Sequence, residues 1–221
     1  MKKFLLKWLL LFIVPSALWA ADATLLVVGD SLSAGYGVTT ERRWVNLLSQ
    51  KLSRHCDAFK VVNASVSGDT SRGGLTRLPA LLSKFNPSLV IIELGGNDGL
   101  RGLNTQEMHS NLQRMVQLSR QAKAQVLLLG VRLPPNYGSD FIKAFHQVYY
   151  DVAKAESVPL IAFFLEGVAL NPQLMQSDGI HPNDQAQAIL RDNVWSGLWP
   201  LLSESGLAAS FCKDPSSGIQ N

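Results

Sequence analysis

The stretch TLLVVGDSLSAGYG, residues 24–37, decides how the rest of the chain is interpreted. It starts with apolar and β-branched residues, which are typical of a strand that is buried on both faces. The strand then passes directly into Gly29, Asp30 and Ser31, and the small residues around the serine let the backbone turn tightly. Ser31 would therefore present its hydroxyl beyond the end of the strand, although taken alone it also fits a helix N-cap or a turn residue.

Outward from this strand, short apolar runs alternate with longer amphipathic segments. This alternation predicts an α/β domain with a doubly wound parallel sheet and helices on both of its faces. In such sheets ligands bind beyond the carboxyl ends of the strands, so function is expected in the loops that follow them. The expected strands are residues 25–28, 60–63, 89–94, 125–130 and 160–163, and the expected helices are residues 44–54, 75–85, 105–122, 139–156 and 183–202.

The first twenty residues, MKKFLLKWLLLFIVPSALWA, differ in character from the rest. A positive start, a short apolar core and a small-residue end are typical of a secretory signal peptide, and the core is too short for a membrane span; an uncleaved anchor is the alternative. The formal charge of +3 comes from this leader, since removing its three lysines leaves 17 basic and 17 acidic residues. We expect a periplasmic or secreted domain at residues 21–202, a tail at residues 203–221, no nucleic-acid partner and no stable membrane insertion after cleavage.

The chain has two cysteines, Cys56 and Cys212. In an oxidising compartment they could form a disulfide across most of the domain. Two unpaired thiols are equally compatible with the sequence, because spacing alone does not show that the two Cα atoms come close enough. Two cysteines this far apart form no metal-binding motif.

Two further strand ends carry groups that could stabilise negative charge. VNASVSGDTSRGG places Gly68 after the second strand, and no side chain shields its backbone N–H. IIELGGNDGLRG places Asn97, with its side-chain amide, after the third. Each also fits an ordinary turn, but their occurrence at successive strand ends favours a site. Glu93, at the end of the third strand, is expected to accept hydrogen bonds from loops, with a catalytic part as the alternative.

The segment MQSDGIHPNDQAQAIL contains Asp178 and His181, three residues apart in a predicted loop. The carboxylate can bind one ring nitrogen while the other points outward, which is the arrangement that a general base requires. A metal site and a purely structural pair are the alternatives, but no other histidine falls in a strand-end loop. Together with Ser31 the pair supplies the nucleophile, base and orienting carboxylate of acyl transfer, and the oxyanion donors are the N–H groups of Ser31 and Gly68 and the amide of Asn97.

The segments GDSLS, GGND and DGIHP and the block around Gly68 resemble the four sequence blocks of the SGNH, or GDSL-type, hydrolases. Within that family the resemblance is greatest to bacterial periplasmic thioesterases, lysophospholipases and arylesterases, and it covers residues 24–202. It implies a three-layer α/β/α, flavodoxin-like fold with a five-stranded parallel sheet in the order 2-1-3-4-5. It also implies the roles given above for Ser31, Asp178 and His181, no cofactor, and a loop at residues 99–104 that shifts when an acyl chain binds.

The function expected from these residues is that of a monomeric serine esterase and thioesterase. It would hydrolyse aryl esters, acyl-CoA and lysophospholipid through an acyl-enzyme intermediate. Rival readings are a carbohydrate O-acetyl esterase on the same site and a lipid-binding protein without catalysis; a nucleotide-binding module is disfavoured because neither glycine-rich phosphate motif is present. Apolar loop residues are candidates for an acyl groove, with ordinary loop packing as the alternative: Leu100, Leu103, Pro134, Pro135, Tyr137 and Ile180.

Overall fold

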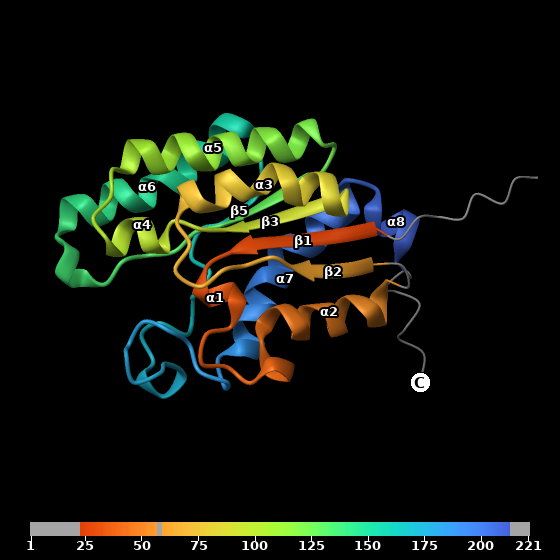
Figure 1. Ribbon diagram of the computed structural model, residues 1–221. Helices are drawn as coiled ribbons and strands as arrows, with labels where there is room; N and C mark the ends of the chain where they lie inside the picture. Colours follow the sequence, from red (N-terminus) through yellow and green to blue (C-terminus); the bar gives the residue numbers. More distant parts are fainter. Residues whose placement is uncertain (1–22, 57–58, 213–221) are drawn as a thin grey trace, which may run out of the picture.

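A parallel sheet of five strands forms the centre of the computed structural model, which describes residues 23–56 and 59–212 (Figure 1). The strand order is β2-β1-β3-β4-β5, as the sequence resemblance implied. The expected leader, residues 1–20, lies outside the described residues. The strands are β1 Ala23–Gly29, β2 Phe59–Asn63, β3 Leu89–Glu93, β4 Gln125–Leu129 and β5 Leu160–Ile161.

Helices cover both faces of this sheet (Figure 1). One face carries α3 Ser71–Phe85, α5 Thr105–Gln121 and α6 Ser139–Glu156, and the other carries α2 Trp44–His55 and α7 Gln187–Glu204. The three-layer α/β/α architecture is therefore confirmed. Five shorter elements lie in the connections: α1 Ser31–Ala34, α4 Gly96–Leu100, and the 3-10 turns η1 Thr40–Arg42, η2 Pro135–Tyr137 and η3 Pro172–Leu174.

Alternate residues of the strands enter two separate hydrophobic cores. In β1, Leu26 and Val28 face the core with α3, α5 and α6, while Leu25 and Val27 face the core with α2 and α7. All four side chains are fully buried. The continuous apolar run of the first strand is thus explained, because a strand covered on both faces has no solvent-facing side.

Two helices start at other residues than the sequence predicted. α3 begins at Ser71 rather than residue 75, because the Thr70 side chain accepts a hydrogen bond from Gly73 N–H and caps the helix. The two glycines in its first turn, which are poor helix formers, concealed this start. α7 begins at Gln187 rather than residue 183, since Asn183 closes a separate turn by accepting from Gln185 N–H.

The fifth strand is shorter than expected. It ends at Ile161 rather than residue 163, because β5 pairs only with β4, and β4 itself ends at Leu129, opposite Ile161. The chain beyond it turns away and becomes part of the loop region at the carboxyl end of the sheet. This difference affects the site, because Phe163 becomes available to line a cavity there.

A disulfide joins Cys56, after α2, to Cys212 near the end of the described chain. It holds α8 Leu207–Phe211 at the edge of the sheet opposite α1 (Figure 1). The first part of the expected tail is therefore helical, and residues 213–221 lie outside the described residues. Within the described part of the chain, no helix has the length and apolar character needed to cross a membrane.

Candidate active site

Ser31 is the first residue of α1 and lies directly beyond β1. Asp30 caps this short helix, because its Oδ1 accepts a hydrogen bond from Leu32 N–H at 3.0 Å. The tight turn requires glycine at position 29, where a Cβ atom would lie 2.7 Å from the Cβ of Ser33. The end of the strand therefore holds the Ser31 hydroxyl at the carboxyl edge of the sheet, as predicted.

The hydroxyl of Ser31 lies 2.9 Å from Nε2 of His181, and Nδ1 of the same ring lies 2.6 Å from Oδ2 of Asp178. Oδ1 of Asp178 accepts from the N–H groups of Ile180 and His181 at 2.9 and 3.0 Å. Desolvation raises the pKa of Asp178, but the hydrogen bonds from the His181 backbone and ring and from Ile180 outweigh it and lower the pKa to about 2. The carboxylate is thus charged at neutral pH and can keep a proton on Nδ1, which leaves Nε2 free to accept one from Ser31.

The loop that carries His181 is attached to the chain that follows α1. Gln176 donates its backbone N–H to the His181 carbonyl at 2.7 Å, and its side-chain Nε2 donates to the Tyr36 carbonyl at 2.8 Å. Asp184 accepts from both the N–H and the hydroxyl of Thr39, at 3.0 and 2.8 Å. The ring centroids of Tyr36 and His181 are 4.7 Å apart. These contacts bring the histidine to the serine, and the sequence analysis missed all of them.

The predicted oxyanion donors lie on two neighbouring loops. Asn97 is on α4, and its Nδ2 donates one hydrogen to Oδ2 of Asp30 at 3.1 Å, which leaves the second N–H available. Gly68 has φ of +81° and is not among the residues that line the cavity described below. Its carbonyl accepts from Arg101 Nη2 at 2.8 Å, so the Gly68 turn is joined to the end of α4.

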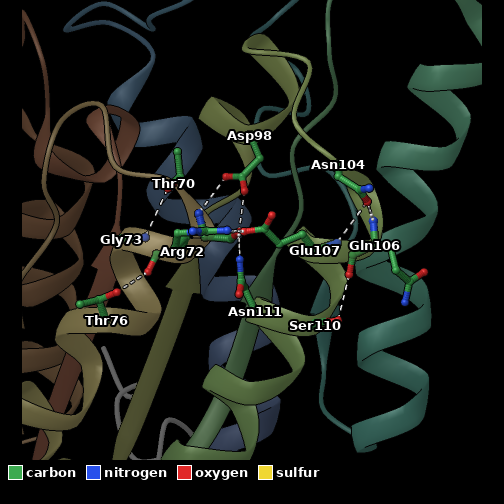
Figure 2. Close-up of polar contacts among 11 residues, drawn as sticks. Thr70, Arg72, Gly73, Thr76, Asp98, Asn104, Gln106, Glu107, Ser110 and Asn111 are labelled. Carbon is green, nitrogen blue, oxygen red and sulfur yellow. Dashed lines mark hydrogen bonds and ion pairs between the residues drawn. The ribbon is translucent and has the colours of Figure 1, made fainter.

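A buried carboxylate, Asp98, fixes α4 against the helix that follows the Gly68 turn. Its two oxygens accept from the N–H and the hydroxyl of Ser71 at 2.8 and 2.5 Å, and Asn111 donates to the same hydroxyl at 3.0 Å. Figure 2 shows Asp98 approaching the start of α3 beside Asn111 of α5, with the Arg72 and Glu107 pair nearby. No role was predicted for Asp98 from the sequence.

Two carboxyl groups are buried behind Ser31. Glu93 is completely buried, and its Oε2 accepts from the Ser33 hydroxyl at 2.7 Å and from Asp30 N–H at 3.4 Å. This confirms the hydrogen-bond role expected for Glu93. Burial, reinforced by the charge of Asp30, raises the pKa of Glu93 well above its usual value, and burial also raises the pKa of Asp30 to about 6. Oε1 of Glu93 has no hydrogen-bond partner among the described residues.

A cavity of about 440 Å³ opens beside the triad and includes Ser31, Asn97 and His181 in its wall. Four of the predicted groove residues line it: Leu100, Pro134, Pro135 and Ile180. Leu103 and Tyr137 do not, because Leu103 faces solvent and Tyr137 packs on the core with its hydroxyl donating to Leu100 O at 3.1 Å. Much of the remaining wall was not predicted: Val131, Arg132, Leu133, Phe163, Leu165, Ala169, Leu170 and Met175.

A serine, an imidazole and a carboxylate in a hydrogen-bonded series, at the strand ends of a parallel α/β sheet, define a serine hydrolase. Within the described part of the chain, no three histidine, cysteine, aspartate or glutamate residues are grouped so that they could hold a metal ion. Residues 27–189 match the GDSL-like Lipase/Acylhydrolase family. The chain belongs to this family.

Relatives of known identity extend over nearly the same length. The chain is 55% identical to Esterase TesA of Pseudomonas aeruginosa over 83% of its own length and 91% of that protein. It is 48% identical to Thioesterase 1/protease 1/lysophospholipase L1 of Escherichia coli K12, over 87% and 92% of the two chains. The crystal structure of the psychrotrophic esterase EstA from Pseudoalteromonas sp. aligns with a TM-score of 0.78 and 40% identity, and covers 82% of this chain and all of that one.

Proposed function

We propose that Ser31, His181 and Asp178 perform the chemistry of a serine esterase and thioesterase. The protein is a hydrolase of carboxylic esters and thioesters, as its family and its relatives indicate. The observation that carries the residue assignment is the 2.9 Å contact between the Ser31 hydroxyl and Nε2 of His181. That distance is within hydrogen-bond reach of the proton that the base must remove.

The geometry supports a two-step acyl transfer. His181 takes the proton from Ser31 as its oxygen attacks the acyl carbonyl, and then gives that proton to the departing alcohol or thiol. Water, deprotonated by His181, next attacks the acyl-enzyme and releases the acid and free Ser31. The developing oxyanion is stabilised by the N–H groups of Ser31 and Gly68 and by the free N–H of Asn97, and a donor of this kind contributes about 3 kcal/mol to the transition state.

The substrates proposed are small-molecule esters and thioesters with an apolar acyl chain, including aryl esters, acyl-CoA and lysophospholipid. Apolar side chains make up most of the wall beside Ser31, and such a wall favours a hydrocarbon chain over an acetyl group attached to a carbohydrate. Hydrolysis of C6 to C12 acyl esters, measured beside acetylated sugars, separates these two activities. Turnover of the acetylated sugars alone would favour the O-acetyl esterase.

We further propose that residues 1–20 are removed on export and that a monomeric enzyme acts in the periplasm or outside the cell. The disulfide between Cys56 and Cys212 supports this location, because such bonds persist in oxidising compartments. The N-terminal residue and the mass of the protein recovered from a periplasmic fraction test the cleavage. An intact leader in that fraction would contradict it.

The catalytic assignment is tested with Ser31→Ala, and Ser53→Ala on the exposed surface of α2 serves as the matched control. We expect Ser31→Ala to lose turnover of p-nitrophenyl esters with an unchanged thermal midpoint, while the control keeps both. A fluorophosphonate probe should label the parent protein at Ser31 and fail to label His181→Ala. Esterase activity remaining in purified Ser31→Ala would overturn the assignment.

A further inference from the structure

The cavity wall contains one fixed positive charge. Among the described residues that line it, Arg132 is the only lysine or arginine. It follows β4 and lies between Val131 and Leu133, both of which are buried. A cation beside apolar walls indicates a ligand with an apolar part and an anionic part.

The guanidinium of Arg132 is held in place without being neutralised. Its central carbon lies 4.9 Å from the ring centroid of Phe163, which also lines the cavity, and such a cation–π contact restrains the side chain. No carboxylate of residues 23–56 or 59–212 forms an ion pair with it. The one carboxylate in the cavity wall, Asp30, is buried and already accepts from Leu32 and Asn97. The charge of Arg132 is therefore free to meet a ligand.

The sheet order places this charge at a distance from the nucleophile. Ser31 follows β1, Asn97 lies just beyond β3, Arg132 follows β4 and Phe163 follows β5, in the order β1-β3-β4-β5 across the sheet. Neighbouring strands are about 4.8 Å apart, so the ends of β1 and β4, which Ser31 and Arg132 follow, are about 10 Å apart along the row of strand ends. The walls between them include apolar side chains such as Leu100 and Val131.

We propose that Arg132 binds an anionic group, a carboxylate or a phosphate, that the substrate carries on the order of 10 Å from the reacting carbonyl. Arg132 then determines specificity for esters whose apolar chain or linker ends in an anion. A guanidinium suits this task because its parallel N–H groups match the oxygens of either anion. The inference rests on the proposed function, since it measures the distance from Ser31 as the attacking residue.

The first arm of the test places the anion on the acyl side. p-Nitrophenyl esters with short and long polymethylene acyl chains, each ended by a methyl group or a carboxylate, are compared by kcat/KM at concentrations below micelle formation. We expect the kcat/KM of the carboxylate-ended ester, divided by that of the methyl-ended ester of equal length, to rise with chain length until the anion reaches Arg132. Arg132→Gln should lower that ratio roughly three- to tenfold for the long chains, a modest effect because Arg132 is exposed and its ion pair would be screened by water. The ratio, and not the absolute turnover of either ester, is the readout, because Arg132 lines the cavity that both esters enter.

The second arm places the anion on the leaving group, by comparing a monoacylglycerol with the same molecule phosphorylated on the glycerol. Arg54→Gln is the control, because it removes the same charge from an exposed position on α2 that has no part in the cavity. Arg132→Lys should keep part of the preference, and added salt should weaken it in the parent protein.

The outcomes of the two arms are separable. A lowered ratio in either arm supports the proposal and shows which side of the ester bears the anion. Unchanged ratios in both arms of Arg132→Gln would overturn it. The proposed function is tested separately. It would be wrong if purified Ser31→Ala still hydrolysed the methyl-ended esters.

Discussion

Asn97 donates its side-chain amide to Asp30, the residue immediately before the proposed nucleophile Ser31, at 3.1 Å. The same carboxylate accepts from Leu32 N–H and caps the helix that begins with Ser31. One buried carboxylate thus holds both Asn97, the proposed oxyanion donor, and the start of the helix that carries Ser31. Each oxygen of Asp30 accepts one of these two hydrogen bonds, an arrangement that suits the ionised carboxylate, which has acceptors only.

Replacing Asp30 with asparagine should disturb this arrangement. The new amide group would face one of the two N–H donors, so Asn97 would lose its orientation, and we expect kcat to fall about 10²-fold with a small change in KM. Steady-state kinetics on a p-nitrophenyl ester measure this. If Asp30 acts through Asn97, the double variant Asp30→Asn, Asn97→Ala should be little worse than Asn97→Ala alone, whereas fully additive losses would contradict the positioning role.

Replacing Asp178 with asparagine should keep the loop but remove the partner of the His181 ring. Asparagine still offers one oxygen to the N–H groups of Ile180 and His181, yet it no longer holds the proton on Nδ1 by charge. We expect kcat to fall about 10²- to 10⁴-fold. Asp192→Asn is the matched control, since Asp192 on α7 binds Lys51 and Arg191, does not line the cavity, and should leave kcat nearly unchanged. Comparable losses in both variants would argue against a specific role for Asp178.

The buried carboxyls predict how stability depends on pH. The pKa values of Asp30 and Glu93 are raised by burial, so the folded protein holds protons that the unfolded chain has released above about pH 4. The contribution of these two protonated carboxyls to the free energy of unfolding is fully present below that pH, and it is lost as pH rises through about 6 and beyond. For Asp30 the rise from 3.8 to about 6 corresponds to about 3 kcal/mol.

Urea unfolding of the parent protein and Glu93→Gln between pH 4 and pH 8 tests this dependence. Glutamine imitates the protonated acid, so the variant should lose less stability than the parent as pH rises. Asp178, whose pKa is lowered to about 2, contributes stability that disappears only in strong acid and does not obscure this range. Parallel pH profiles for the two proteins would show that Glu93 is ionised in the fold.

Removing the disulfide should affect stability rather than catalysis. Cys56 and Cys212 are 156 residues apart in sequence, so their bond restricts a long loop of the unfolded chain. We expect Cys56→Ser combined with Cys212→Ser to lower the free energy of unfolding by about 2–5 kcal/mol. The esterase rate at low temperature should be retained, because the bond is made next to α8, which lies at the end of the sheet opposite α1 (Figure 1). A large loss of activity in a folded double variant would contradict this.

The layers of this protein were predicted well, because the patterns that indicate strands and helices involve residues that are neighbours in the sequence. The apolar runs of β1, β3 and β4 predicted buried strands, and the amphipathic segments between them predicted the helices that cover the sheet. Predictions were weaker at element ends, where a single contact decides the boundary. The cap from Thr70 and the one-sided pairing of β5 are two such contacts.

The sequence by itself determined the layers of the fold and nominated the chemistry of the site, because side-chain periodicity and strand-end position can be read from neighbouring residues. Only the tertiary structure decided how these groups meet. Ser31 and His181 are 150 residues apart, and Asp30 and Asn97 are 67 apart, yet each pair is joined by a hydrogen bond. The cavity wall at Arg132 and Phe163 also arises from packing of separate strand ends, since a cavity is a property of side chains brought together by the fold.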